Sequence, residues 1–331
     1  MDMTRPPAPL PAPPRRWRDA LVLGALLAAM LGGLAALASA TGWEASLAQL
    51  ARLGPLEIGA LLALSLVNYL GRALRWHVFV RRLGLPLGLA ASLRHFLGGF
   101  AMSVTPGRVG ELVRMRWIGR ETGWSFDRTA PLALVDRAAD LAAMGLILGA
   151  ALAAMSGGIA GAVPVAVAAV AAAVAVTRPA TLRVLATRAH GLIGRWSRLF
   201  ARIRGAARSL ARVSDPRTMT LALFLGAAGW LAEGYALHLL LVWLGADIGA
   251  AAAIAIFVFA TLAGGLTGAP GGLGGAEAAM VALLSVQGVP LEISIPATAI
   301  IRLTTLWFAL AIGLAVFPHA ERRAARALGR G

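Results

Sequence analysis

The chain of 331 residues contains no cysteine and no lysine. Without cysteine there are no disulfide bonds and no thiolate nucleophiles or metal ligands. Without lysine, arginine supplies every strongly basic side chain, and arginine binds phosphate and carboxylate groups through paired N–H donors. The sequence also lacks a cluster with metal-ligand spacing, a nucleotide-binding loop and a nucleophile–base motif. We therefore expect a protein that is not an enzyme and that needs no metal and no cofactor.

Acidic residues are scarce as well, at 15 against 31 basic ones, which gives a formal net charge of +16. Hydrophobic residues make up 59% of the chain, more than a soluble domain can bury, so we expect an integral membrane protein. Because the arginines flank apolar runs, the positive-inside bias and anionic lipid explain the charge better than nucleic acid does. The predicted partners are anionic membrane lipids and not nucleic acid.

Six apolar runs are long enough to cross a hydrocarbon core of about 30 Å. They cover residues 20–40, 56–80, 129–154, 160–177, 219–244 and 294–317. Residues 1–19 are rich in proline and arginine and are predicted to be a disordered cytoplasmic segment, while residues 318–331 form a basic cytoplasmic tail. Arginines crowd the run ends that this topology puts in the cytoplasm, first of all Arg72, Arg75, Arg81 and Arg82. We expect one membrane domain over residues 20–317 in a bacterial inner membrane, with both termini cytoplasmic.

A proline–glycine motif occurs twice, 164 positions apart: Pro106-Gly107-Arg108-Val109-Gly110 and Pro270-Gly271-Gly272-Leu273-Gly274. The apolar stretch before the first motif, residues 96–105, reaches only about 15 Å as a helix, which is half a membrane. Each motif is followed 31 or 32 positions later by an arginine within an apolar run, Arg137 or Arg302. The pattern predicts two re-entrant hairpins, over residues 89–126 and 254–287, that belong to two copies of one unit.

Charge predicts opposite orientations for the two copies. Arginines surround the first hairpin, which should open to the cytoplasm, whereas Asp247, Glu277 and Glu292 flank the second, which should open outward. The expected fold is therefore an all-α inverted-topology repeat with about six transmembrane helices plus two re-entrant hairpins. Repeat one covers residues 56–154 and repeat two residues 219–317. Eight ordinary spans are the alternative, and the charges between positions 108 and 120 disfavour them.

The segment between the repeats, residues 178–217, contains ten arginines and one acid. Its apolar residues share one helical face and most arginines avoid it, which is typical of an amphipathic helix on the inner leaflet. The alternative is a linker whose charges are simply solvated.

The candidate binding residues are the two arginines inside spans and the acids near them. Inversion brings Arg137 and Arg302 near the membrane centre, where they are suited to holding a phosphate. The alternative is structural ion pairing, of Arg137 with Asp140 and of Arg302 with Glu233 or Glu277. Asp136 and Asp140 share a helical face and either relay protons or bind a cation, or else neutralise nearby arginines.

The two motifs supply the remaining candidates. Arg108 lies at the cytoplasmic mouth, where it either attracts an anionic headgroup or only fixes topology. Glu111 and Glu277 follow the two motifs at different spacings, and Glu111 suits the start of a half-helix. The structural glycines and prolines of the motifs, which either expose amide groups to a ligand or only make tight turns, are Pro106, Gly107, Gly110, Pro270, Gly271 and Gly274.

The stretch Thr105 to Arg114, with Leu134 to Leu141 downstream, resembles the membrane region of lysylphosphatidylglycerol synthases, a region also found in stand-alone flippase-like proteins. Residues 270–277 and 301–307 resemble the second half of that region. The resemblance covers about residues 20–317 and implies lipid translocation, because the soluble domain that makes the aminoacyl lipid in full-length synthases is absent here. One departure is that Glu277 stands two positions later in its motif than Glu111 does.

The resulting hypothesis is a flippase-like protein that moves an anionic phospholipid or a polyisoprenoid-linked lipid between leaflets. A non-transporting membrane partner of a lipid-modifying enzyme is the first alternative. A transporter of ions or small solutes with the same fold is the second.

Overall fold

The computed structural model describes residues 51–103, 109–156, 215–267 and 269–328, with a few isolated positions elsewhere. Within these ranges the secondary structure is helical, without strands, as the sequence predicts. The predicted spans at 20–40 and 160–177 lie outside the described residues apart from isolated positions, and so does the segment 178–217. Pro106, Gly107 and Arg108 also lie outside them.

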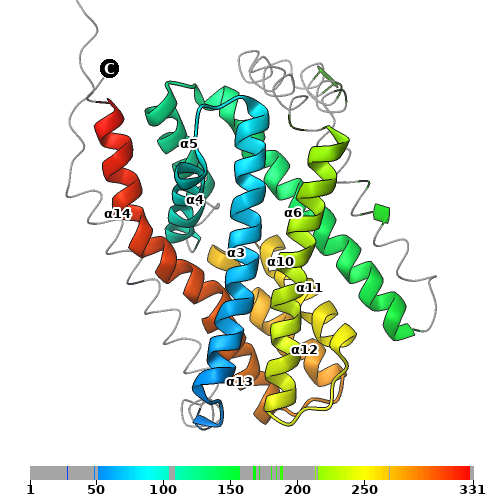
Figure 1. The fold of residues 1–331 in the computed structure, drawn as a ribbon. Helices are drawn as coiled ribbons and strands as arrows, with labels where there is room; N and C mark the ends of the chain where they lie inside the picture. Colours follow the sequence, from blue (N-terminus) through cyan, green and yellow to red (C-terminus); the bar gives the residue numbers. More distant parts are fainter. Residues whose placement is uncertain are drawn as a thin grey trace, which may run out of the picture.

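Four helical segments are long and apolar enough to cross a membrane, and they confirm four of the predicted spans (Figure 1). They are α3 (Pro55–Leu83), α6 (Phe126–Ser156), α10 (Pro216–Trp243), and the run of α13 (Leu291–Arg302), η4 (Leu303–Trp307) and α14 (Phe308–Leu328). The last segment continues beyond the predicted limit of residue 317, so most of the predicted basic tail is helical.

The ends of the long helices carry local signals. Pro55 begins α3, where its missing N–H costs nothing, and Gly84 ends it with a left-handed φ of 90° that suits glycine. Asp215 caps α10, because its side chain accepts a hydrogen bond from the Thr218 amide at 3.0 Å.

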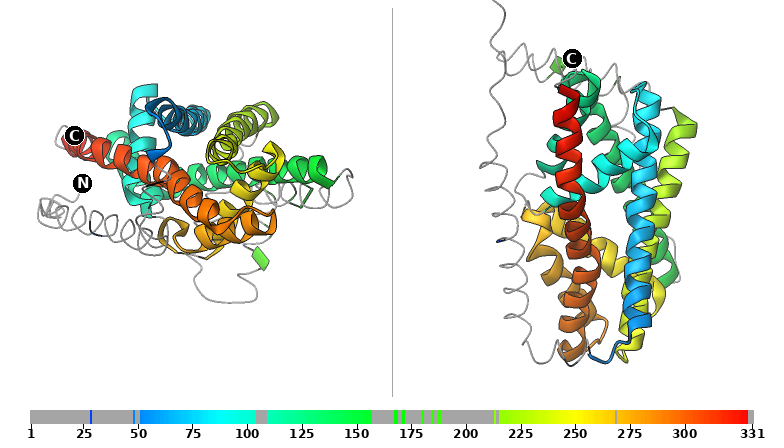
Figure 2. Two further views of the ribbon diagram at one scale, coloured as in Figure 1. Left: turned by 90° about the horizontal axis from the view of Figure 1, so that it is seen from below. Right: turned by 60° about the vertical axis from the view of Figure 1, so that its left-hand side comes forward.

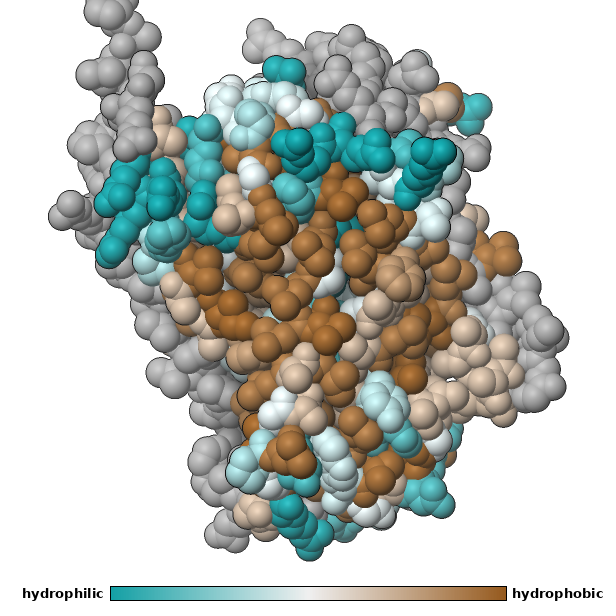
Figure 3. Space-filling view, in the orientation of Figure 1, coloured by the Kyte–Doolittle hydropathy of each residue, from teal (hydrophilic) through white to brown (hydrophobic). Residues whose placement is uncertain are grey.

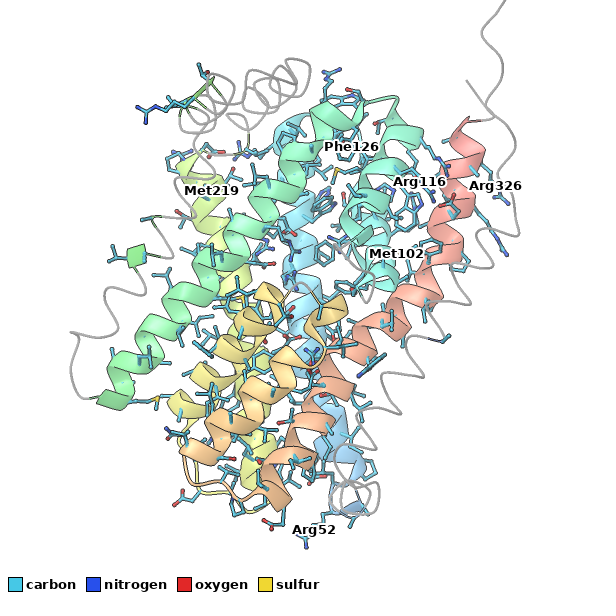
Figure 4. The ribbon with its side chains drawn as sticks, turned by 180° about the vertical axis from the view of Figure 1, so that it is seen from behind. Arg52, Met102, Arg116, Phe126, Met219 and Arg326 are labelled. Atoms are coloured by element: carbon cyan, nitrogen blue, oxygen red, sulfur yellow. The ribbon has the colours of Figure 1, made fainter. Side chains whose placement is uncertain are left out.

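Two shorter helix pairs lie at opposite ends of the molecule (Figures 1 and 2). The first helix pair is α4 (Leu89–Gly98), η1 (Gly99–Met102) and α5 (Val109–Thr122), and the second is α11 (Ala250–Leu266), η3 (Pro270–Gly272) and α12 (Gly275–Val286). At 17 and 12 residues, α11 and α12 reach about 26 and 18 Å, less than a hydrocarbon core of about 30 Å. Arg116 and Arg326 lie toward the end of the molecule that carries the first helix pair, and Arg52 lies at the opposite end (Figure 4).

The turn of the second helix pair depends on glycine. Gly271, Gly272 and Gly274 have φ values of 63°, 69° and 80°. Side chains rarely tolerate this left-handed region, so the chain reversal requires glycine at all three glycine positions of the motif. Gly264 allows the two helices to meet, since its Cα side lies against the backbone of Gly272 and Ala276.

The surface has a membrane-like distribution of polarity. Figure 3 shows an apolar belt between two polar ends on the face where α3 and α10 lie. Leucines of α3 and large side chains of α10 are exposed there, for example Leu70 at 46% and Phe224 at 68%. Such exposure is costly in water and favourable against lipid tails.

Small residues set the closest helix contacts. On α10, an added Cβ at Gly226 would lie 2.8 Å from the Arg75 guanidinium, and one at Gly229 would lie 2.9 Å from the Asn68 Cα. On α14, Gly313 touches the backbone of η1 at Phe100 and Ala101. Glycine at these positions lets the helices approach closely enough to pack, as is common in membranes.

The contact at Gly313 generates the first prediction. Gly313→Ala should lower stability by about 1–3 kcal/mol, because the new methyl group has to push α14 away from η1. The matched control is Gly59→Ala on α3, where no atom lies within 4 Å of the new Cβ. That change should be neutral or stabilising by up to about 1 kcal/mol. Thermal unfolding in detergent measures both, and equal melting temperatures for the two variants would contradict the proposed contact.

Candidate functional site

A cavity of about 520 Å³ lies between the two helix pairs and the long helices. Met102 at the end of η1 and the turn residues Gly271 and Gly272 both border it, so the two helix pairs share one cavity. Met102 lies part-way between the two ends of the molecule (Figure 4). The charged residues among its described lining are Arg72, Arg114, Arg137, Asp140, Glu233 and Arg302.

A buried ion network forms one wall of the cavity. Arg75 on α3 is completely buried, and its guanidinium donates to Asp136 Oδ1 at 2.5 Å and to Asp140 Oδ1 at 2.8 Å. The two acids are one helical turn apart on α6, so a single arginine spans both. The Trp230 indole N–H adds a hydrogen bond to Asp140 Oδ1 at 3.2 Å. The network therefore joins α3, α6 and α10.

Two further arginines share these acids and face the cavity. Arg72 donates to Asp140 Oδ2 at 2.9 Å, and its guanidinium lies 5.0 Å from the Trp230 ring centroid. Arg137 is farther from its partners, at 3.3 Å from Asp136 and 3.4 Å from Asp140. Its side chain is 32% exposed, against 0% for Arg75. The contacts of Arg137 with these two acids are thus longer than those of Arg75, and its side chain is more exposed.

On the opposite side, Arg302 joins α13 to the second helix pair. Its Nε donates to Glu277 Oε1 at 2.5 Å, and its Nη2 donates to the Gly271 carbonyl at 2.9 Å. Arg302 therefore ties the glycine turn and the start of α12 to α13. Arg114, from the first helix pair, lies against aromatic rings, with its guanidinium 4.2 Å from the Phe96 centroid.

A wide helical turn follows Arg302 directly. Residues Leu303–Trp307 form the π-helical turn η4, in which the ordinary hydrogen-bond ladder is displaced. The Tyr69 hydroxyl on α3 donates to the Thr305 carbonyl in this turn. The Thr305 hydroxyl bonds back to Ile301 at 2.6 Å. These contacts satisfy backbone carbonyl groups within and just before the π turn.

Much of the remaining cavity lining is apolar. Leucine, methionine and phenylalanine side chains contribute to it, among them Leu141, Met144, Phe257 and Leu262. Leu266 at the rim is 89% exposed. The cavity therefore offers both cationic groups and hydrocarbon side chains, as an amphipathic ligand requires.

The sequence comparisons identify the family. Residues 21–313 match the model of the lysylphosphatidylglycerol synthase transmembrane region. The chain belongs to this family. It is also similar to a "UPF0104 membrane protein" of Methanothermobacter thermautotrophicus, with 33% identity over 90 residues, 27% of each chain. A second UPF0104 match from that organism has 30% identity over 118 residues, 36% of this chain and 35% of the relative. The aligned part is about a quarter to a third of each relative's length. The family membership and the long apolar helices together identify this chain as a multi-pass membrane protein.

The structure of this family member brings together several residues that the sequence predicts for the site. Arg137, Asp140, Arg302 and Gly271 line the cavity, and Asp136 and Glu277 lie behind them as ion-pair partners. The ion pairs are those offered as the structural alternative, namely Arg137 with Asp140 and Arg302 with Glu277. Gly110 lies within α5 and Gly274 in the glycine turn. The side chains of Glu111 and Pro270 are outside the described set, as is Arg108.

Sequence reasoning missed Arg72, Arg75 and Glu233 as members of this site. It assigned the first two to the positive-inside bias and treated Glu233 only as a possible partner of Arg302. A signal was present, because Asn68, Arg72 and Arg75 recur at the spacing of one helical face within an apolar run. Charges on one face of a spanning helix point to a polar interior and not only to topology.

The two arginines of α3 and α6 should differ in their effect on stability. Arg75→Gln leaves Asp136 buried without its main partner and should cost about 3–5 kcal/mol. Arg137→Gln removes longer contacts from a side chain that is 32% exposed and should cost less than about 1 kcal/mol. Thermal unfolding and size-exclusion chromatography in detergent compare them. A larger loss for Arg137→Gln than for Arg75→Gln would contradict this division of roles.

Proposed function

We propose that this protein moves a lipid with an anionic headgroup between the two leaflets of a bacterial inner membrane. The observation that carries the proposal is that Arg137 and Arg302, from two distant parts of the chain, line one cavity that is also rich in apolar side chains. A phosphate diester would contact the arginines while its acyl chains remain against hydrocarbon. Membership of the lysylphosphatidylglycerol synthase transmembrane family adds support, because the family name connects this region with a phospholipid.

The architecture we propose for this function is an inverted repeat. In it, the two helix pairs are re-entrant hairpins that enter the membrane from opposite sides and meet near its centre. Their lengths, their positions at opposite ends and their shared cavity support this assignment (Figure 1). Such hairpins are tolerated at membrane depth when protein or a polar cavity surrounds them.

We infer the orientation from charge. The end that carries the first helix pair and the C-terminal part of α14 contains most of the described arginines. The opposite end carries Glu57, Asp247 and Glu292, with Arg52 as its basic residue. The positive-inside bias then assigns the first end, including the C-terminus, to the cytoplasm. With the predicted first span at 20–40, the N-terminus is cytoplasmic as well.

Translocation is tested in proteoliposomes that contain a fluorescent phosphatidylglycerol. Arg137→Gln and Arg302→Lys should each slow its transfer about ten- to hundredfold, since each loses hydrogen bonds to a charged phosphate. Arg326→Gln is the matched control, because it removes an exposed arginine outside the cavity and should leave the rate unchanged.

The outcomes separate the alternative functions. If all three variants transfer the lipid at the wild-type rate, in vesicles where the wild-type protein accelerates transfer, the proposed role of the cavity arginines is wrong. Substrate-dependent current without lipid transfer would instead indicate an ion or solute transporter. Loss of function only on deletion of residues 178–217 would indicate a docking role for that segment.

Topology has its own test, made simple by the cysteine-free chain. We expect single cysteines at Gln287, in the loop after α12, and at Arg323, near the end of α14, to react with a membrane-impermeant maleimide from opposite sides. Both positions are exposed. In right-side-out cells only Gln287→Cys should label, and labelling of both positions from one side would contradict the inverted arrangement.

A further inference from the structure

Glu233 on α10 is a buried carboxylate that borders the cavity. Its exposure is 4%, and it makes no hydrogen bond and no ion pair with any described residue. The other carboxylates of the site, Asp136, Asp140 and Glu277, each bind an arginine. A buried carboxylate without a donor is costly when ionised, so its presence in a functional cavity calls for an explanation.

Charged groups reach Glu233 from most of the elements packed against α10. Helices α3, α6, α11 and α13 contact α10, and α11 contains no ionisable residue. Arg72, Arg302 and Asp140 lie within electrostatic range of Glu233. The titratable and charged groups of these elements that line the cavity or pair with its lining are Tyr69, Arg72 and Arg75 on α3, Asp136, Arg137 and Asp140 on α6, and Arg302 on α13, to which Glu277 on α12 is paired. His238 lies on α10 itself, five residues after Glu233.

The state of Glu233 depends on what fills the cavity. In the empty cavity, the nearby arginines favour the ionised carboxylate while burial opposes it. An anionic phosphate bound to Arg137 and Arg302 would add a negative charge beside Glu233, so the neutral acid would become more favourable. The neutral carboxyl group also has an O–H that can donate to a phosphate oxygen, which the carboxylate lacks.

We propose that Glu233 takes up a proton when a phosphate diester binds in the cavity, so that the anion and the proton occupy the site together. The proton comes from water and bonds to a carboxylate oxygen of Glu233, and it leaves when the phosphate leaves. Because the two bind in concert, a pH difference across the membrane would bias the distribution of the lipid. This inference rests on the proposed function and identifies its coupling residue.

The test is calorimetric titration of the purified full-length protein with dihexanoyl phosphatidylglycerol below its micelle concentration. The phosphate diester stays ionised throughout the range from pH 5.5 to 8.5, so the ligand itself neither gains nor loses a proton. Titrations in buffers of different ionisation enthalpy give the number of protons taken up per ligand bound. For the wild-type protein we expect uptake of up to one proton. The affinity should fall up to about tenfold per pH unit over the range in which free Glu233 has lost its proton and the bound form still holds it.

Two variants assign the proton to its residue. Glu233→Gln keeps the shape but cannot titrate, so its proton uptake should vanish and its affinity should no longer change with pH. Glu292→Gln is the matched control, since Glu292 is exposed near the start of α13 and far from the charged groups of the cavity. Its proton uptake should equal that of the wild-type protein. Glu233→Asp, which still titrates, should retain uptake over a shifted pH range.

Failure of this inference is distinct from failure of the proposed function. Binding without proton uptake by the wild-type protein overturns the role of Glu233, and so does unchanged uptake in Glu233→Gln. If Glu233→Gln does not fold, Glu233→Asp decides, and proton uptake over the same pH range as in the wild-type protein would then overturn the role of Glu233. An absence of phosphatidylglycerol binding at every pH overturns the proposed function, and the inference falls with it.

Discussion

Arg75 holds a full positive charge where no solvent reaches it, and the arrangement of the surrounding helices follows from the need to neutralise that charge. Its guanidinium group bridges Asp136 and Asp140, which fixes α3 against α6 in both height and rotation. Gly226 on α10 leaves the space that the guanidinium occupies. With Arg75 satisfying the inner carboxylate oxygens, the outer ones remain for Arg72 and Arg137 at the cavity. The buried pair thereby orients the residues that face a ligand.

In the second half of the molecule, a buried arginine is also neutralised, but by fewer charged groups. Arg302 has one carboxylate partner, Glu277, and completes its hydrogen bonding with the carbonyl of Gly271. A backbone carbonyl is available there because the glycine turn leaves the helical hydrogen-bond pattern. One wall of the cavity is therefore a dense ion network, and the other is a single arginine bound to a chain reversal. The two walls thus hold their arginines with different sets of partners, and both present guanidinium groups to the same cavity.

Composition and hydropathy were sufficient to predict much of this fold. The helix boundaries of α3, α6 and α10 differ from the predicted spans by only a few residues, because long apolar runs with capping residues have few alternative structures. The π-helical turn η4 was not predicted, since nothing in Leu303-Thr304-Thr305 distinguishes it locally from an α-helix. The Tyr69 hydroxyl that bonds to Thr305 in this turn comes from another helix, so the contact is not visible in the local sequence.

The candidate site was predicted in part, for a related reason. Arg137 and Arg302 stand out because each is the single arginine within its predicted span. Arg72 and Arg75 lie only a few positions from the cluster Arg81 and Arg82, and charge counting merged the four into one topological signal. Glu233 is isolated too, but its lack of a partner is a property of three-dimensional packing and has no counterpart in the order of residues. Helical-face analysis of residues 68–75 would have recovered the arginines of α3 but not the state of Glu233.

The π-helical turn η4 sets the rotation of α14 relative to α13 in the last long helical segment. A π turn accommodates one residue more than an α turn, and one residue corresponds to about 100° of rotation. Without that additional residue, Arg302 could point toward the cavity only if Gly313 turned away from η1, or the reverse. The π turn thus allows the direction of Arg302 and the direction of Gly313 to be set separately, whereas a regular helix would link them. One continuous segment can therefore contact the glycine turn through Arg302 and the first helix pair through Gly313.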